Sequence, residues 1–590
     1  MPNNNFLFKL LKFLSVKPTR VSVPDSNVEK VTEELPAAAV PVLVPIPVVS
    51  SESADLSSLP KNFDAELYLK YNADLGPGTD PVDHYLNHGY RDTWRIFAYP
   101  EIQFSKTRSA NPEFETILIV SHAASRSGAP ILALNLVEVL ATRYNVVVLL
   151  LGDGALVEAF QDAAIAIMLN PTFNYNMEYA DSTIQYLCKE FSFKFSLVNS
   201  VESHVVLELL ANNFVPTVSL IHEFASAYAD SRKLFSNIGL WSSELVFSAN
   251  LTWDNAIELC PELSSITAHI IPQGQCVLPD LELSRNQLNI ESEQLRKKLR
   301  PEGAVDKKFL VVGAGYSNYR KGVDLFIQCA AKVKQSPAGD NFRFVWIGGG
   351  YNPNSEDGYS VYIADQIKRS GLHDYVVLLD ETAAIETVYQ ETDLLFVSSR
   401  LDPLPNVAID ALSKQVPVIC FDKATGIADF LIANDLREFC VADYLDVDDA
   451  CRKIIALGTS ESLYKQVSCK SHEAAASYFD MKKYVEKLEA LGCLSSQRIR
   501  QQASDVKTII ESDLYCFNNA NSENSFSVAK TRDVVRYVRE WACGINTRKP
   551  RLDFDPATYL DLHGTANTEV DPFADYLRSG RPQGAWDTSN

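Results

Sequence analysis

The sequence has 590 residues, of which 46% are apolar and 22% are charged. This length predicts about three to five domains, and the composition is that of a folded globular protein, which excludes a wholly disordered, collagen-like or membrane-embedded chain. Lys and Arg total 54 and Asp and Glu total 75, giving a formal net charge of −21; so acidic a body repels the phosphates of nucleic acid, and no nucleic-acid partner is expected.

Residues 1–60 are predicted to form an amphipathic helix and a disordered linker. Residues 6–17 combine large apolar side chains with lysines, among them Lys9 and Lys12, and hold no acidic residue. This pattern favours a helix on an anionic membrane surface, and docking on the protein's own body or a floppy tail is an equally open alternative. Residues 18–60 are rich in Pro, Val, Ser and Glu without a period, which indicates a linker.

Cysteine usage and hydropathy bear on the compartment. The eleven cysteines are scattered, form no CxxC pair and often lie in apolar surroundings, which favours free thiols in a reducing compartment over disulfides or a zinc site. No apolar run reaches the ~18 residues that span a bilayer. Lys9 and Lys12 interrupt the apolar stretch that a secretory signal needs. The expected location is therefore cytoplasmic, peripheral at the inner face of the membrane if the first helix binds there.

Two similar segments lie near the ends of the chain, within 61–105 and 550–590. Residues 63–89 and 554–580 share, at a constant offset, a leading Phe, a Tyr, an Asp-Pro pair, a Tyr-Leu pair and a final Gly. Asp at the N-cap, Pro at the first helical position and Gly after the end predict one short helix in each copy. A unit of ~40 residues has a marginal core alone, so each copy is expected to lean on the body or on its twin.

Residues 112–285 are predicted to form a doubly wound α/β domain. The buried strand Ile117–Val120 runs into a loop of small residues, followed by an apolar helix and the strand Val146–Leu151. This is a βαβ unit with parallel strands. Further strands are expected at Phe195–Val198, Thr217–Ile221 and Leu245–Ser248.

Residues 286–492 repeat the pattern after a charged helix, and 493–549 form a connector to the second repeat. Residues 471–492 are expected to be one long final helix. Because ligands of open α/β sheets bind at the carboxyl ends of the strands, two such domains predict a cleft lined by these ends. The strands are expected at Phe309–Val312, Phe344–Ile347, Val376–Leu379, Leu394–Val397 and Pro417–Cys420.

Four motifs follow strands of the second α/β domain in order. They are GAGYSNYRKGVDLF, a triple glycine at 348–350, SSRLDPLPNVAIDALS and PVICFDKATGIADFL. This order resembles the retaining, nucleotide-sugar-dependent glycosyltransferases of family 4, which have the GT-B fold. The resemblance covers residues 115–490, and the end segments are similar to small helical repeats that flank bacterial glycosyltransferase domains.

The resemblance implies an α/β chain with the GT-B fold: two doubly wound parallel-sheet domains facing across a cleft, with small helical modules at both ends. Residues 112–285 would be the acceptor side, 286–492 the donor-binding side, and the final helix would cross back to the first domain. GT-B enzymes generally need no bound metal, so no metal and no other cofactor is expected. The cleft-facing loops hold no Asp-x-Asp motif of the kind that binds a metal. Asp446-Val447-Asp448 matches that motif, but it precedes a helix, where it is predicted to form a cap.

Cleavage of a nucleotide sugar leaves negative charge on the departing phosphate, so cationic and amide donors must lie where that charge develops. Lys321, in a Lys-Gly pair, is a point charge suited to this role, and Arg320 is a second candidate. The loop Leu404–Val407 opens a helix expected at Val407–Ser413, so the backbone amides of Asn406 and Val407 are expected to face the anion.

Two acidic residues accompany this helix. Asp410 lies one turn into it and can accept from two vicinal hydroxyls of a ribose, whereas Asp402 in the preceding loop would reach the transferred sugar; the resemblance assigns the same roles. The family usually has Glu at both places, and Asp is shorter by about 1.5 Å, so the donor must sit closer or a water must bridge. An Arg common in the family is absent near Gly315, and Arg400, Arg320 or a group of the first domain is expected to replace it.

The first α/β domain contributes three further candidates. The loop SHAASRSGAP resembles the family's small-residue loop at the donor phosphates, where Gly128 allows close backbone approach and Ser127 can donate. The strand Thr217–Ile221 ends at His222, where the family commonly has a His, and a neutral imidazole there can bond the transferred sugar. Glu223 is a weaker candidate for a contact with the acceptor.

The resemblance also implies the reaction. Retaining hydrolases use two carboxylates ~5 Å apart, and no such pair is obvious in this sequence. The family is thought to use a same-face displacement in which the leaving phosphate helps to deprotonate the acceptor. The expected protein is a hexosyl-type glycosyltransferase that uses a UDP- or GDP-sugar as donor and a glycan or lipid-linked glycan as acceptor. Its expected role is in cell-surface polysaccharide synthesis, and its expected catalytic residues are His222, Lys321 and Asp402.

Two alternatives stay open. A non-catalytic glycosyltransferase-like protein that binds a glycan or a partner fits the Asp-for-Glu changes and the missing Arg, whereas His222 and Lys321 argue against it. A dehydrogenase or epimerase would need GxGxxG after the first strand and an acid ~20 residues further on, and SHAASRSGAP lacks that spacing.

Overall fold

The computed structural model describes residues 59–92, 94–279, 285–301, 307–354, 358–516, 526–545, 549–563 and 570–587. The helix predicted at 6–17 lies outside the described residues, as does the linker up to residue 58. Within the described ranges, no helix is both long and apolar enough to cross a bilayer. All eleven cysteines are free, and six of them are buried.

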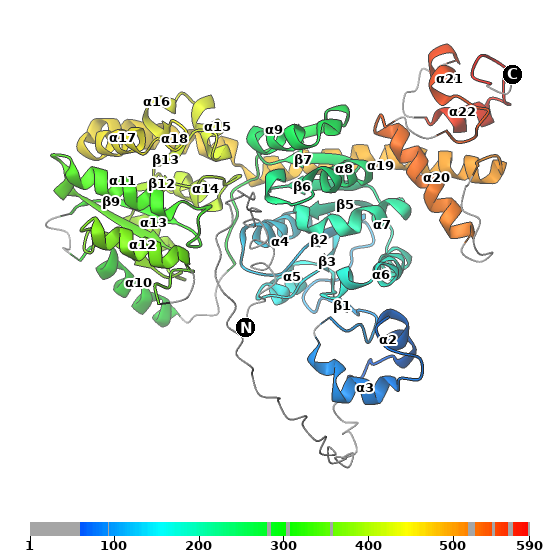
Figure 1. Ribbon diagram of the computed structural model, residues 1–590, viewed down its shortest axis with the longest axis horizontal. Helices are drawn as coiled ribbons and strands as arrows, with labels where there is room; N and C mark the ends of the chain where they lie inside the picture. Colours follow the sequence, from blue (N-terminus) through cyan, green and yellow to red (C-terminus); the bar gives the residue numbers. More distant parts are fainter. Residues whose placement is uncertain are drawn as a thin grey trace, which may run out of the picture. The chain divides into compact units, whose positions relative to one another are not determined.

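The first α/β domain is built on an eight-stranded sheet of order β1-β4-β3-β2-β5-β6-β7-β8 (Figure 1). All neighbours pair in parallel except β1, which runs antiparallel to β4. The strands are β1 Ile102–Phe104, β2 Thr116–Ser121, β3 Asn145–Leu150, β4 Ala166–Leu169, β5 Phe193–Asn199, β6 Thr217–Ile221, β7 Glu244–Phe247 and β8 Ala268–Ile270.

Both faces of this sheet are covered by helices, which is why its central strands read as unbroken apolar runs. Leu118 and Val120 of β2 enter one core with α6, α7 and α8, whereas Ile117 and Ile119 enter another with α4, α5 and the later helix α19, Met481–Ser512. The helices are α4 Gly128–Leu140, α5 Val157–Ala163, α6 Met177–Glu190, α7 Leu207–Asn212, α8 Ser231–Trp241 and α9 Asn250–Leu259.

The second α/β domain has a six-stranded, wholly parallel sheet of order β11-β10-β9-β12-β13-β14. Its strands are β9 Phe309–Ala314, β10 Phe342–Ile347, β11 Val376–Leu379, β12 Leu394–Val397, β13 Val418–Phe421 and β14 Val441–Ala442. Its helices are α10 Arg285–Leu299, α11 Val323–Gln335, α12 Gly358–Arg369, α13 Ile385–Glu391, α14 Asn406–Ser413, α15 Gly426–Ala433, α16 Arg437–Cys440, α17 Val447–Thr459 and α18 Glu461–Tyr478.

The prediction of one final helix over residues 471–492 is wrong. The structure ends α18 at Tyr478 and starts α19, Met481–Ser512, after a break at which Asp480 accepts hydrogen bonds from two backbone amides of the new helix. Asp is a strong N-cap, so it starts a second helix rather than continuing the first. α19 then continues through residue 492 into the predicted connector and packs on β5, β6 and β7 of the first sheet.

The two end segments have the same internal structure. Helices α2 Ala65–Tyr71 and α3 Pro81–Asn87 form the first, and α21 Pro556–His563 and α22 Pro572–Arg578 form the second, which follows α20 Phe526–Ala542. Asp80 and Asp571 cap α3 and α22, each accepting from two backbone amides. The matching Tyr rings meet edge-on in both copies, with centroids 5.8 Å apart.

Candidate functional site

Both sheets have a switch point at which successive connections leave in opposite directions. In the first sheet it lies between β2 and β5, and in the second between β9 and β12. Open α/β sheets bind ligands beyond the carboxyl ends of such strands, because the diverging loops leave a crevice there. The predicted Lys321 follows β9 and the predicted Asp402 follows β12, so they lie on the two sides of the second switch point.

The structure brings Lys321, Arg320 and Asp402 together. Lys321 Nζ lies 2.6 Å from Asp402 Oδ2, and Arg320 Nη1 lies 3.2 Å from Oδ1. The Ser399 hydroxyl donates to Oδ2 at 3.1 Å, and Asp402 is only 5% exposed. Burial by itself would raise the pKa of Asp402, but the charges of Lys321 and Arg320 outweigh it and lower the pKa below its usual value.

Two glycines allow this arrangement. Gly315 has a φ of +135°, and a Cβ there would lie 3.0 Å from Cε of Lys321, so the lysine stem crosses directly over the glycine. Gly322 has a φ of +69°, and a Cβ there would overlap the carbonyl oxygen of Ser398. Both positions favour glycine, because L side chains rarely adopt these backbone conformations, and at Gly322 the backbone also leaves no space for a Cβ.

The amino end of α14 lies in the same loop as Asp402. Pro405 precedes the helix, no side chain caps it, and the backbone N–H groups of Asn406 and Val407 make no hydrogen bond within the described part of the chain. A Cβ on Gly128, the first residue of α4, would lie 3.5 Å from Nδ2 of Asn406. Ser127 precedes α4 and shares a 2.9 Å hydrogen bond with the Ser125 hydroxyl. Two positive helix ends therefore meet, which suits an anion.

Asp410 is less available than the sequence suggested. Its carboxylate lies 3.5 Å from Gln275 Nε2 and 3.4 Å from the Tyr389 hydroxyl, both long for hydrogen bonds. Burial raises the pKa of Asp410 to about 6. Gln273 also donates to the Asn406 side chain, so Gln273 and Gln275 contact two of the residues expected to bind the donor.

The arginines that could replace the missing family arginine have different partners in the structure. Arg400 makes two hydrogen bonds to Asp324, at 2.9 and 2.7 Å, and stacks on the Tyr319 ring with its guanidinium carbon 3.8 Å from the centroid. Arg126 of the first domain donates to the Pro279 carbonyl. Arg320 is the candidate that reaches Asp402.

A second cluster lies at the first switch point. His222, at the end of β6, shares a hydrogen bond of 3.0 Å between its Nε2 and Oδ1 of Asn199, and burial followed by the influence of His122 lowers the pKa of His222 to about 4. The buried Nδ1 atoms of both histidines have no hydrogen-bond partner among the described residues. Glu223 accepts from the Ser200 hydroxyl and from the backbone amides of Val201 and His222, so it holds the loop together.

His122 and Asn199 are not predicted as site residues from the sequence. They directly follow β2 and end β5, on the two sides of the switch point. The signal that could have found them is this position after a predicted strand. Among the residues that the structure describes, no group of three or more His, Cys, Asp or Glu side chains is arranged to hold a metal ion.

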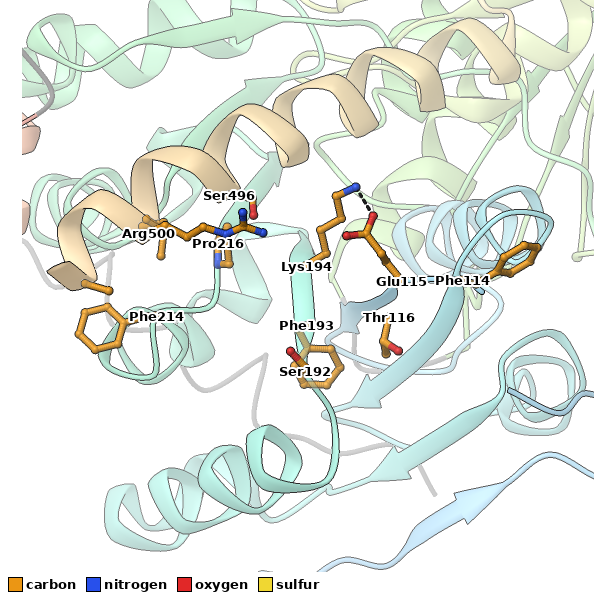
Figure 2. Close-up of a pocket in the computed structure, with 12 residues that line it drawn as sticks. Phe114, Glu115, Thr116, Ser192, Phe193, Lys194, Phe214, Pro216, Ser496 and Arg500 are labelled. Atoms are coloured by element: carbon orange, nitrogen blue, oxygen red, sulfur yellow. Dashed lines mark hydrogen bonds and ion pairs between the residues drawn. The ribbon is translucent and has the colours of Figure 1, made fainter. Parts of the chain in front are cut away.

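A cavity of about 450 Å³ lies elsewhere, at the amino ends of β2 and β5 and against α19. Figure 2 shows Lys194 and Glu115 paired in it and Arg500 on the helix beside them. Because it opens at the opposite edge of the sheet, the cavity contains none of the predicted site residues.

Comparisons with known proteins identify the second domain and the fold. Residues 295–473 match the family model described as glycosyl transferases group 1, so the second domain contains such a domain. A curated relative, alpha-galactosylglucosyldiacylglycerol synthase of Streptococcus pneumoniae, is 29% identical over 122 residues, which is 20% of this chain and 30% of that protein. The chain therefore matches less than a third of this relative's length.

Two solved structures share the fold. Anabaena HepE in complex with UDP is 16% identical, with a TM-score of 0.51 over 64% of this chain and 99% of that chain. The N-terminal domain of Candida albicans trehalose-6-phosphate phosphatase is 11% identical, with a TM-score of 0.50 over 67% of this chain and all (100%) of that chain. The predicted fold class, GT-B with two parallel-sheet domains, is confirmed.

Proposed function

We propose that the protein is a retaining glycosyltransferase of family 4 that moves a hexose from a UDP- or GDP-sugar to a glycan acceptor in cell-surface polysaccharide synthesis. The observation that carries the proposal is the pairing of Lys321 with the buried Asp402 in the loop that leads to the uncapped amino end of α14, inside the glycosyl transferases group 1 domain. A cation and free amides at one place are what a departing diphosphate requires.

The charges of this cluster favour an anion. Asp402 neutralises one of the two cations Lys321 and Arg320, so one positive charge remains, to which the amino end of α14 adds its partial charge. Holding Lys321 against a buried carboxylate fixes its ammonium group before the donor arrives, so little reorganisation is needed when negative charge develops.

Asp402 retains the capacity to contact the sugar. A carboxylate has about four acceptor sites on its two oxygens, and three are used: Oδ2 accepts from Lys321 and Ser399, and Oδ1 accepts from Arg320. The remaining site on Oδ1 can accept one sugar hydroxyl. In this role Asp402 orients both the lysine and the sugar.

The proposed reaction is the same-face displacement that the family resemblance implies. The bond between the anomeric carbon and the phosphate oxygen breaks, a bond to the acceptor oxygen forms on the same face, and the acceptor proton passes to the leaving phosphate. Lys321, Arg320 and the α14 amides stabilise the charge on that phosphate, and His222 accepts a hydrogen bond from the transferred sugar. No protein nucleophile and no metal takes part in this scheme.

Donor and acceptor classes are supported by the neighbours. Solved complexes of Anabaena HepE contain UDP or UDP-glucose, and the curated relative is named as a synthase of a glycosylated diacylglycerol. A lipid-linked acceptor would suit a protein whose residues 6–17 bind the inner face of the membrane. Sedimentation with anionic liposomes, compared between the full chain and a chain lacking residues 1–20, tests that location.

A non-catalytic glycan- or partner-binding protein is the second candidate. Gln275 and Tyr389 contact Asp410, and Arg400 pairs with Asp324. Donor binding and donor hydrolysis separate the two functions.

We expect the wild-type protein to bind UDP or GDP and to hydrolyse the matching nucleotide sugar slowly. Lys321→Ala should weaken nucleotide binding by about tenfold or more, the equivalent of ~1.4 kcal/mol, and should abolish hydrolysis. Lys321→Gln, which keeps a hydrogen-bond donor beside Asp402, guards against a simple folding defect. Calorimetry measures the affinities, and Lys332→Ala is the matched control because Lys332 pairs with Asp448 away from the site. Equally poor binding by wild type and Lys321→Ala would contradict the enzymatic function.

A further inference from the structure

Asn199 ends β5, is fully buried, and contacts both His222 and the first turn of α4. Its Nδ2 donates to the Ala129 carbonyl at 2.7 Å, and its Oδ1 lies 3.0 Å from Nε2 of His222. Ala129 belongs to the first turn of α4, the helix whose amino end faces Asn406. One side chain therefore joins the histidine to the helix end expected at the donor phosphates.

The chemistry of these partners fixes the amide orientation. A backbone carbonyl can only accept, so Ala129 must face the NH₂ group of Asn199, and the amide oxygen must face His222. The flipped amide would set two carbonyl oxygens against each other. Because the amide oxygen can only accept, the His222 ring must present its N–H at Nε2, and its Nδ1 must then carry a lone pair.

The surroundings keep this arrangement in place. Ser200, next in the chain, has a φ of +79°, a strained conformation for a residue with a Cβ. Its hydroxyl donates to Glu223 at 2.7 Å, and the other oxygen of that carboxylate accepts from the backbone amide of His222. The ends of β5 and β6 are thereby tied together, which fixes Asn199 relative to His222.

The titratable groups around His222 favour its neutral form. Burial of the ring, followed by the neighbouring His122, disfavours protonation of His222, and Glu223 directs its oxygens to Ser200 and to backbone amides rather than to the ring. The Nδ1 atom of His222 is buried and has no partner among the described residues. A buried acceptor without a donor costs free energy, so its presence beside a binding site points to a donor that arrives with the ligand.

We propose that Asn199 is a positioning residue that holds His222 as the neutral Nε2–H tautomer, so that Nδ1 accepts a hydrogen bond from a hydroxyl of the transferred sugar. This inference rests on the proposed function and deepens it. The sugar must carry a hydroxyl at that place, and a deoxy analogue should be rejected because it leaves Nδ1 unpaired.

The first test reads the tautomer directly, without any activity. In protein labelled with ¹⁵N-histidine, wild-type His222 should show a protonated Nε2 and an unprotonated Nδ1 at neutral pH, assigned by the loss of its signals in His222→Ala. Asn199→Leu should release the tautomer into a mixture, and Asn199→Asp should stabilise the imidazolium, with a proton on Nδ1. Asn145→Leu is the matched control, because Asn145 is another buried asparagine that bonds backbone carbonyls, at the amino end of β3.

The second test is kinetic. Loss of an outer-shell partner that orients a metal-ligating histidine costs about 10–100-fold; by analogy, we expect kcat/KM of Asn199→Leu to fall by about that factor. In Asn199→Asp the acidic limb of the pH profile should move to higher pH. Wild type should prefer the intact sugar over one deoxy analogue, and Asn199→Leu should lose most of that preference.

The outcomes are separable. A proton on Nδ1 of wild-type His222 at neutral pH, or an Asn199→Leu variant with unchanged tautomer and kinetics, would overturn the proposal. The expected tautomer and its loss in Asn199→Leu, together with no transferase activity on any donor, would uphold the positioning role and reject the proposed enzyme. If Asn199→Leu fails to fold, the wild-type spectrum and Asn199→Asp still decide.

Discussion

At the scale of single residues, Gly322 carries the backbone turn that delivers Lys321 to Asp402. It lies in the left-handed region with a φ of +69°, and the carbonyl oxygen of Ser398, at the end of β12, occupies the place of its missing Cβ. The turn after β9 and the end of β12 are therefore in direct contact, and any side chain at this position must push them apart. The effect would reach the ammonium group of the neighbouring lysine.

We expect Gly322→Ala to lower the free energy of unfolding by about 1–3 kcal/mol and to weaken UDP or GDP binding by about tenfold. Denaturant titration measures the first quantity and calorimetry the second. Gly371→Ala is the control, because Gly371 has a similar φ of +61° with nothing within 4 Å of the added Cβ. Equal nucleotide affinities in the two variants would contradict the role given to this turn.

The site could be predicted from the sequence where its residues share a motif. Lys321 and Asp402 were named because they stand in ordered motifs after two strands, and the structure brings them to 2.6 Å. His122 and Asn199 carry no local pattern, since each is one polar residue after an apolar strand. Only the strand order, which places β5 beside β2, brings them next to His222.

At the scale of elements, the central strands were predictable and the short edge strands were not. Strands buried on both faces form apolar runs that stand out from the sequence. The strands β1, β8 and β14 were missed because they are two or three residues long at or near the edges of their sheets. The missed β4, Ala166–Leu169, directly follows α5 and reads like its continuation.

Helix α19 shows a long-range contact that no periodicity reveals. Gly492 lies midway along it, against the ring of Phe195 in β5, and a Cβ at Gly492 would come within 2.6 Å of Cγ of that ring. Glu489, one turn earlier, accepts hydrogen bonds from Arg143 and from the Tyr144 hydroxyl. The glycine lowers helix propensity, but it allows the helix to approach the sheet closely.

We expect Gly492→Leu to destabilise the protein by about 1–3 kcal/mol through overpacking against Phe195, although the change improves helix propensity by up to about 1 kcal/mol. Thermal unfolding followed by circular dichroism measures the effect. Leu494→Gln is the control on the same helix, because Leu494 is 46% exposed and should change stability little. A variant at 492 as stable as wild type would show that the helix can move away from β5 at no cost.

At the scale of the whole molecule, the internal repeat predicted two similar modules but not their different surroundings. Tyr68 bonds His84 in the first module, and Tyr559 bonds Asp575 at the equivalent place in the second. The capping Asp80 is exposed, whereas Asp571 is 4% exposed and its backbone amide donates to buried Asp505 on α19. The shared Asp-Pro pair thus fixes the cap, while tertiary packing decides whether the carboxylate is exposed to water.

This difference makes the second module pH-sensitive. Burial, with a contribution from nearby Asp505, raises the pKa of Asp571 to about 7, above the ~3.9 of an exposed Asp, so the folded state holds the proton more tightly than the unfolded state. The stabilising contribution is complete below about pH 4 and is lost as the pH rises through about 7.

Amide exchange in α22, corrected for its intrinsic pH dependence, should therefore accelerate by about tenfold or more between pH 5 and 8. Asp571→Asn keeps the cap but cannot ionise, so the corrected amide exchange of α22 in this variant should not change with pH. The control is Asp80→Asn in the first module, which should not change the corrected amide exchange of α3. A pH dependence retained in Asp571→Asn would assign the effect to another group.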